Sequence, residues 1–412
     1  MPKAVPIAHL LCGFLLGAAA PAAAQDPAAT PADRAQPFFG PAPTLRSGDW
    51  SLKLRGRIQV DAGWIERPDG IALPEDRLGS GGELRRARLG VEGTMPGGFN
   101  YVFEVDLAPD VVEIVDATLT YSATPELSIT AGQHNPFQSL EELNSSRFTS
   151  FIERAAFTDA FNFERRLGLS ASWSHGPILV QAGVFQDNLL DIDEDGNNSR
   201  SVDGRIVYAP KRGETQLHFG ASAHHRSNGD LDDRGATTRY RQRPLVHFTD
   251  TRFISTPALR VSSETDYGLE AAVIAGPFHA AAEAHWLNAE TPGAEPTFFG
   301  GYAEAGFYLT GESRGYRGGR FDRTRVRRPV GGGGIGAVQL NLRYDRLDLN
   351  SAGIVGGTQD GYLASLIWIP QDHLRFLLNA GRLEHRDAVI PAAGGDRSYG
   401  STVVAARAQV DF

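Results

Sequence analysis

The last twelve residues of the chain, 401–412, alternate with a period of two and end on the aromatic residue Phe412. Small or apolar side chains occupy the even positions, whereas the odd positions carry mostly polar ones, with Val403 and Ala405 as exceptions. This period is typical of a strand whose two faces meet different surroundings. An edge strand of a soluble sheet would show the same alternation. It also suits the closing strand of a membrane barrel, which must pair with the first strand so that no edge meets lipid.

The same alternation begins at Trp50 and recurs through the rest of the chain. One face of the first segment carries Lys53, Arg55 and Arg57, which are costly against lipid and natural against water. Connections alternate between short ones, such as 96–98, and long ones, such as 65–82, with 311–334 as the exception. The pattern predicts an all-β transmembrane antiparallel β-barrel of about sixteen strands. Aromatic residues near the strand ends are expected in the interfacial girdles: Trp64, Tyr121, Trp173, Trp286, Tyr308 and Trp368.

The N-terminal part predicts export. Residues 1–24 have the features of a secretory signal peptide, 25–48 are rich in Pro and Ala and predict a flexible periplasmic segment, and 49–412 would form the barrel. The chain has no run of 18 apolar residues that would predict a membrane helix. Forty basic and 49 acidic residues, less Lys3 in the signal, leave a charge of about −10. This balance argues against nucleic acid or acidic lipid as the obvious partner. The barrel prediction gives outer-membrane lipid as the expected surroundings.

Charged residues on the polar faces of the first strands are candidates for lining a lumen. We expect arginines to face acids across a narrow channel and so create a transverse field. The arginines are Arg55, Arg57, Arg86 and Arg88, and the acids are Glu104, Asp106 and Asp116. Residues 135–166 contain enough apolar side chains to fold inward and narrow the lumen, although a surface loop with a short helix is the alternative.

Two further segments carry concentrated charge. Residues 311–329 predict either an electropositive periplasmic mouth, formed by Arg317, Arg320, Arg323 and Arg325, or a solvated turn. Asp191, Asp193 and Asp195 begin like a calcium loop, but Val202 stands where a bidentate Glu is required. No metal site is therefore predicted, with weak Ca²⁺ binding as the alternative. The chain carries no catalytic or cofactor-binding motif, so neither an enzyme nor a cofactor is expected.

Several ordered motifs resemble the phosphate-selective porin O and P family over roughly residues 52–412. They include Arg85-Arg86-Ala87-Arg88-Leu89-Gly90, Leu140-Glu141-Glu142-Leu143, Phe151-Ile152-Glu153-Arg154 and Leu342-Arg343-Tyr344-Asp345. The resemblance implies a homotrimeric outer-membrane porin of a Gram-negative bacterium, with an inward loop lined by positive side chains. It places Arg85, Arg86, Ser145 and Ser146 at the narrowest point. Glu142 stands where phosphate-selective members have a lysine, and it would repel phosphate unless Arg147 compensates.

The sequence thus predicts a water-filled channel for small hydrophilic solutes that prefers anions, phosphate or other oxyanions among them. A general or cation-tuned porin is the alternative, followed by a barrel enzyme or a plugged structural barrel. Phe412 resembles the C-terminal signal that the barrel assembly machinery reads, so this machinery is an expected partner.

Overall fold

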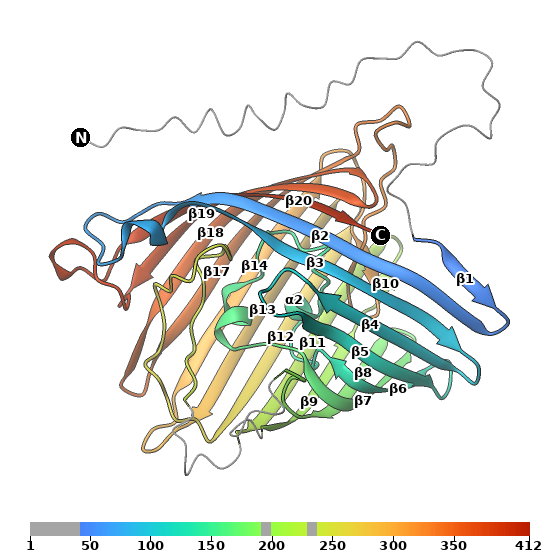
Figure 1. Ribbon diagram of the computed structural model, residues 1–412, viewed down its shortest axis with the longest axis horizontal. Coiled ribbons are helices and arrows are strands. Elements are labelled where there is room, and N and C mark those ends of the chain that lie inside the picture. Colours follow the sequence, from blue (N-terminus) through green and yellow to red (C-terminus); the bar gives the residue numbers. More distant parts are fainter. Residues whose placement is uncertain (1–41, 191–198, 229–236) are drawn as a thin grey trace. The chain divides into compact units, whose positions relative to one another are not determined.

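In the computed structural model, which describes residues 42–190, 199–228 and 237–412, the chain forms one closed antiparallel barrel (Figure 1). Its sheet has eighteen strands, of which β1 (Thr44–Ser47) and β10 (Lys211–Arg212) are short additions to the barrel wall. The sixteen strands of the wall are β2 (Trp50–Ile65), β3 (Gly79–Met95), β4 (Phe99–Asp106), β5 (Glu113–Ser122), β6 (Leu127–His134), β7 (Arg166–His175), β8 (Ile178–Phe185), β9 (Arg200–Tyr208), β11 (Thr215–Ser227), β12 (Ser263–Ala275), β13 (Phe278–Glu290), β14 (Thr297–Tyr308), β17 (Ala337–Ser351), β18 (Ile354–Gln371), β19 (Leu374–Arg386) and β20 (Gly400–Asp411).

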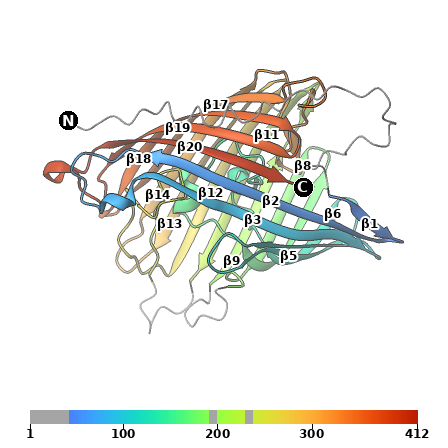
Figure 2. The same ribbon diagram turned by 45° about the horizontal axis from the view of Figure 1, so that its top comes forward.

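The barrel closes where the terminal alternation predicted it. β20 pairs with β2 from Arg57 opposite Asp411 to Ile65 opposite Val403, and the two strands lie side by side in Figure 2. Gly56 and Phe412 add two backbone hydrogen bonds of 3.1 Å beyond these pairs. Closure leaves no unpaired edge, which is the condition for a sheet surrounded by lipid.

The predicted faces are confirmed. Along β20 the odd-numbered residues from Ser401 to Asp411 are buried inside the barrel. The apolar residues of β2 from Leu52 to Trp64 face outward and are exposed, whereas Ile65 at the end of the strand is buried. The outward tryptophans Trp64, Trp286 and Trp368 are each more than a third exposed, as girdle residues would be. The girdle prediction is wrong for Tyr308, which is 2% exposed and points inward, where its hydroxyl lies 2.6 Å from Thr324 Oγ1.

The connections differ at the two ends of the barrel. The turn end has short connections, except residues 309–336, which contain the strands β15 (Gly315–Arg317) and β16 (Arg320–Asp322). The loop end has the long ones, with the 3-10 helices η2 (Glu75–Arg77) and η3 (Ala393–Gly395). β1 falls within the segment predicted to be flexible, and its backbone pairs with residues 50–53 of β2. None of the helices in the described ranges is long and apolar enough to cross a membrane.

The hydrophobic core of the molecule lies inside the barrel. The connection between β6 and β7, residues 135–165, is here named the inward loop, and it contains α2 (Leu140–Leu143) and α3 (Ala156–Ala160). Its apolar side chains Phe151 and Phe157 are fully buried and belong to one cluster with Phe298 and Tyr302 of β14. Packing of this kind fills the β14 side of the lumen.

Candidate functional site

The short helix α2 of the inward loop is held by hydrogen bonds at both of its ends. Ser139 is the N-cap of α2, and Glu283 of β13 accepts hydrogen bonds from Ser139 Oγ (2.8 Å), Leu140 N (2.9 Å) and Glu141 N (2.7 Å). At the other end, Arg154 Nη2 donates to the carbonyl oxygen of Asn144 at 2.8 Å. A four-residue helix has no free-standing stability, and these contacts satisfy the backbone groups that it leaves unpaired.

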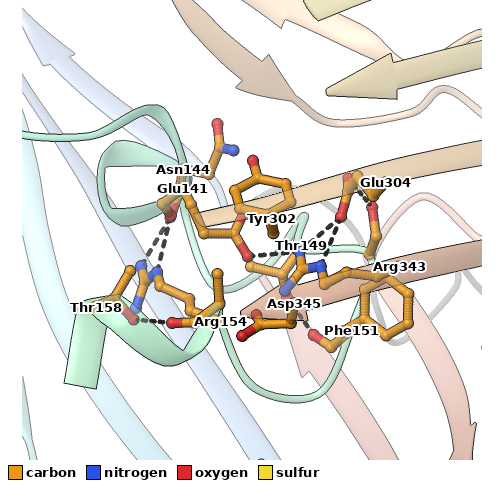
Figure 3. A network of polar contacts seen from close by, with 12 residues as sticks. Glu141, Asn144, Thr149, Phe151, Arg154, Thr158, Tyr302, Glu304, Arg343 and Asp345 are labelled. Carbon is orange, nitrogen blue, oxygen red and sulfur yellow. Dashed lines mark hydrogen bonds and ion pairs between the residues drawn. The ribbon is translucent and has the colours of Figure 1, made fainter. Parts of the chain in front are cut away.

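A buried ionic network then ties the loop to the wall (Figure 3). Arg343 of β17 donates to Glu141 Oε1 at 2.7 Å and to Glu304 Oε2 of β14 at 2.6 Å, so it bridges the loop and the barrel. The Arg343 guanidinium also lies 4.5 Å from the ring centroid of Phe151. Asp345 accepts a hydrogen bond of 3.0 Å from Ala156 N at the start of α3. The prediction that residues 135–166 fold inward is therefore confirmed.

The tip of the loop reaches the opposite wall. Arg57 Nη1 of β2 donates to Ser146 Oγ at 2.5 Å, and Gln59 Nε2 donates to the Ser146 carbonyl at 3.1 Å. The loop consequently crosses the lumen from β13 to β2.

A second wall contact of the loop is ionic. Glu153 lies 2.9 Å from Arg85 Nε and 3.2 Å from Arg407 Nη2. Burial alone would raise the pKa of Glu153, but these two guanidinium groups outweigh it and hold the pKa well below its ordinary value. The Glu153 carboxylate is therefore a permanently charged anchor between the inward loop and the seam of the barrel.

Residues 311–329 form a hairpin that rises into the lumen from the turn end. Phe321 is 2% exposed, and its backbone N donates to Asn144 Oδ1 of the inward loop at 2.9 Å. Arg314 Nη1 donates to Ser150 Oγ of the same loop at 2.7 Å. This hairpin, β15 to β16, is thus a second obstruction directly against the inward loop. It is not the solvated turn that the sequence left open.

The predicted mouth arginines divide into two groups. Arg317, Arg320 and Arg325 are exposed. Arg323 is engaged, because its guanidinium pairs with Asp411 at the end of β20. Three of the four therefore leave positive charge at the turn end of the lumen.

The arrangement of the charged wall corrects the expectation of a field across the lumen. The acids lie on the same side of the barrel as the arginines and pair with them along one wall, either on the neighbouring strand or on the strand beyond it. Arg55 Nε lies 2.8 Å and Arg57 Nη2 3.1 Å from Glu104 of β4. Arg88 lies 2.7 Å from Asp106, the next inward residue of β4, and Arg165 lies 3.0 Å from Asp116 of β5. Neighbouring inward positions on adjacent strands are close enough to pair, and sequence alternation alone does not distinguish this from a facing pair.

The remaining candidates lie on the inward loop. Glu142 Oε2 lies 3.4 Å from Arg154 Nε, so its charge has a partner that the sequence did not indicate. Ser145 Oγ accepts from Arg147 Nε at 3.2 Å, and Arg147 Nη1 lies 3.7 Å from Asp411. Burial alone would lower the pKa of Arg165, but Asp116 and Glu142 outweigh it and raise the pKa. Both carboxylates therefore act on the same cation at the edge of the passage.

A cavity of about 440 Å³ lies on the loop-end side of the inward loop. It is lined by β3 through Arg85, Arg86 and Arg88, by the inward loop, and by residues 242–247 of the connection between β11 and β12. Its arginines are nearly all paired with carboxylates. Arg86 is the exception: within the described part of the chain no carboxylate oxygen lies within 4.0 Å of it, and its Nη1 donates to the neutral Gln59 Oε1 at 3.0 Å.

The candidate calcium residues Asp191, Asp193 and Asp195 lie outside the described residues. Among those that are described, no group of three or more His, Cys, Asp or Glu side chains is arranged to hold a metal ion.

A closed sixteen-stranded barrel with a charged lumen and an inward loop across it is the architecture of an outer-membrane porin. Comparison with known proteins gives the same class. The family model described as phosphate-selective porin O and P matches residues 52–412, and the chain belongs to this family. It is therefore an outer-membrane channel protein of a Gram-negative bacterium and not an enzyme.

Relatives and solved structures agree with this assignment. The chain is 54% identical to a protein of Caulobacter vibrioides over 380 residues, covering 90% of this chain and 76% of that one. It is 27% identical to Porin O of Pseudomonas aeruginosa, covering 75% of each. An anion-selective porin from Comamonas acidovorans superimposes with a TM-score of 0.56 at 12% identity, covering 88% of this chain and all of that one. The outer-membrane channel DcaP of Acinetobacter baumannii gives 0.54 at 13% identity, covering 89% and 99%.

Proposed function

We propose that the channel prefers small anions, and that Arg86 is the residue most responsible. Arg86 lines the cavity above the inward loop, and among the described residues it has no carboxylate partner, unlike the other arginines there. It lies between Arg85 and Arg88 in the sequence of β3. A cation that no acid neutralises, in a water-filled passage of low surrounding dielectric, attracts anions and repels cations.

A general porin without phosphate specificity is the second candidate. It is favoured by the extent of charge pairing, since Arg55, Arg57, Arg88 and Arg165 all lie within 3.1 Å of a carboxylate. It is also favoured by Glu142, a carboxylate that lines the cavity and that the family resemblance places where phosphate-selective members have a lysine. We therefore propose a preference for anions as a class and not specificity for phosphate.

The zero-current potential across a KCl gradient in planar bilayers tests the proposal. We expect an anion-selective sign for the native channel and a shift toward zero for Arg86→Gln. Arg382→Gln is the matched control, because Arg382 is exposed on β19 and pairs with Glu66 and Glu384 away from the lumen. A cation-selective potential, or equal shifts in both variants, would overturn the proposal.

We further propose a homotrimer that the barrel assembly machinery inserts by reading Phe412. Trimeric assembly is typical of the family, and one solved structure with this fold, OmpT of Vibrio cholerae, is described as a trimer. Cross-linking of membranes followed by electrophoresis tests this state, and a monomer as the sole species would refute it.

A further inference from the structure

The cavity above the inward loop has the size of a pocket for a small organic molecule. Its volume of about 440 Å³ lies in the range of about 300–1,000 Å³ that is typical of pockets for small organic molecules. Pockets of that kind combine apolar walls with a few placed polar groups.

One wall is apolar. Leu245 and Val246 from the connection between β11 and β12, and Phe163 from the inward loop, line the cavity and are each less than 9% exposed. Leu245 has a φ of 56°, which is strained for a branched residue and persists only where its surroundings impose it. Two contacts hold this segment in place. Arg243 N donates to Asp159 Oδ2 at 2.8 Å, and His247 Nδ1 lies 2.8 Å from Glu83 Oε2 on β3.

The opposite wall is charged, and its balance is close to neutral. Six arginines and five carboxylates line the cavity, apart from His247, so one positive charge remains. Arg86 is the arginine without a carboxylate partner in the described part of the chain. One uncompensated cation suits a monoanion, whereas phosphate carries close to two negative charges above neutral pH.

We propose that this cavity binds a small organic monoanion, namely a carboxylate attached to an aromatic or branched apolar body. The carboxylate would accept hydrogen bonds from the Arg86 guanidinium, which suits planar carboxylates. The apolar body would lie against Leu245, Val246 and Phe163 and leave water. This inference rests on the proposed anion preference and names the solute class for the same passage.

Block of single-channel KCl current tests the inference, with benzoate as the probe. Acetate supplies the carboxylate without the body, benzyl alcohol supplies the body without the charge, and inorganic phosphate supplies a dianion. We expect half-block by benzoate at a concentration about tenfold lower than by the other three, since one apolar contact in a pocket is worth about tenfold or more.

Leu245→Asn is the decisive variant, because asparagine tolerates a positive φ and replaces the apolar side chain with a polar one. It should remove most of the advantage of benzoate over acetate. Val246→Ser is a second test of the same wall, and Val355→Ser is the control, since Val355 is 59% exposed on β18.

The proposal that the cavity binds an organic monoanion would be overturned by equal block by benzoate and acetate. Tighter block by phosphate or by benzyl alcohol than by benzoate would also overturn it. The KCl potential separates this failure from failure of the proposed function. An anion-selective potential with equal block leaves the anion preference standing, whereas a cation-selective potential removes both.

Discussion

Replacement of Glu283 by glutamine should release the first turn of the inward loop. Glu283 is 4% exposed and accepts three hydrogen bonds from residues 139–141. A hydrogen bond to a charged acceptor contributes about 1.5–3 kcal/mol, against about 0.5–1.5 for a neutral one. The three bonds should together lose about 3 kcal/mol, and one glutamine N–H would also point at a donor. Glutamine keeps the volume, so packing is little changed.

Hydrogen exchange of the backbone amides measures this loss directly. The amides of Leu140 and Glu141 donate to the Glu283 carboxylate, so local opening controls their exchange. A loss of about 3 kcal/mol corresponds to exchange that is about a hundredfold faster, at 1.4 kcal/mol per factor of ten. Mass spectrometry of the peptide covering residues 135–145, in detergent or in lipid, gives the rate.

Glu264→Gln is the control for this experiment. Glu264 is a buried carboxylate of β12 at 3% exposure, but its partners are Arg226 and Tyr240 and not the inward loop. Exchange in residues 135–145 should be unchanged in this variant. If both variants accelerate exchange equally, or if Glu283→Gln changes it less than about tenfold, the reasoning about this anchor is wrong.

Three further changes follow from other contacts. Glu153→Gln removes the carboxylate partner of Arg85, whereas Arg407 keeps Asp61 at 2.7 Å, and the change should raise anion selectivity, measured as zero-current potential. Because Arg85 and Arg407 hold the pKa of Glu153 well below its ordinary value of about 4.3, the carboxylate stays charged at about pH 4, and acidification of the native channel to that pH should not reproduce this effect. Gly63→Leu should impair barrel closure, seen as loss of the heat-modifiable folded band, because a Cβ there would lie 2.5 Å from the carbonyl oxygen of Val404 and 2.9 Å from Ala405 Cα on β20; unimpaired folding would refute this. Arg314→Gln should loosen the turn-end hairpin from Ser150 and increase single-channel conductance, whereas the control Arg325→Gln, at an exposed position, should not.

The fold could be predicted because lipid and water impose a period-two pattern on every wall strand. The faces of β2 and β20 and the closure between them follow from that pattern alone. Tyr308 shows where the argument fails, since aromatic character near a strand end does not say on which side of the wall the side chain lies. Its inward position follows from the period-two alternation of β14, in which Tyr308 lies on the same face as Tyr302.

The candidate site could be predicted only in part. Its arginines and serines were found from inward parity and from the family resemblance. The sequence does not predict the anchors Glu283 and Arg343, because their partners on the inward loop are more than a hundred residues away. It does not predict the anchor Glu304 either, because the hairpin of residues 311–329 must fold into the lumen before Arg314 can reach it. The available signal is a charged residue at a position of β13, β14 or β17 that the period-two alternation places on the lumen face. It identifies lumen residues but cannot give their partners.

The path of the inward loop across the lumen explains why charged residues have different roles on different parts of the barrel wall. On the β13, β14 and β17 side, charged residues such as Glu283, Glu304 and Arg343 are consumed in holding the inward loop, and their buried charges are compensated locally. On the proposed function, solutes pass along the wall formed by β2 to β5, where Arg55 and Arg57 of β2 pair with Glu104 of β4 and Arg88 of β3 pairs with Asp106 of β4. On such a wall the local field at each pair is small, so selectivity depends on the residue that lacks a partner. For this reason a single neutralisation at Arg86 should change selectivity more than neutralisation of any paired arginine.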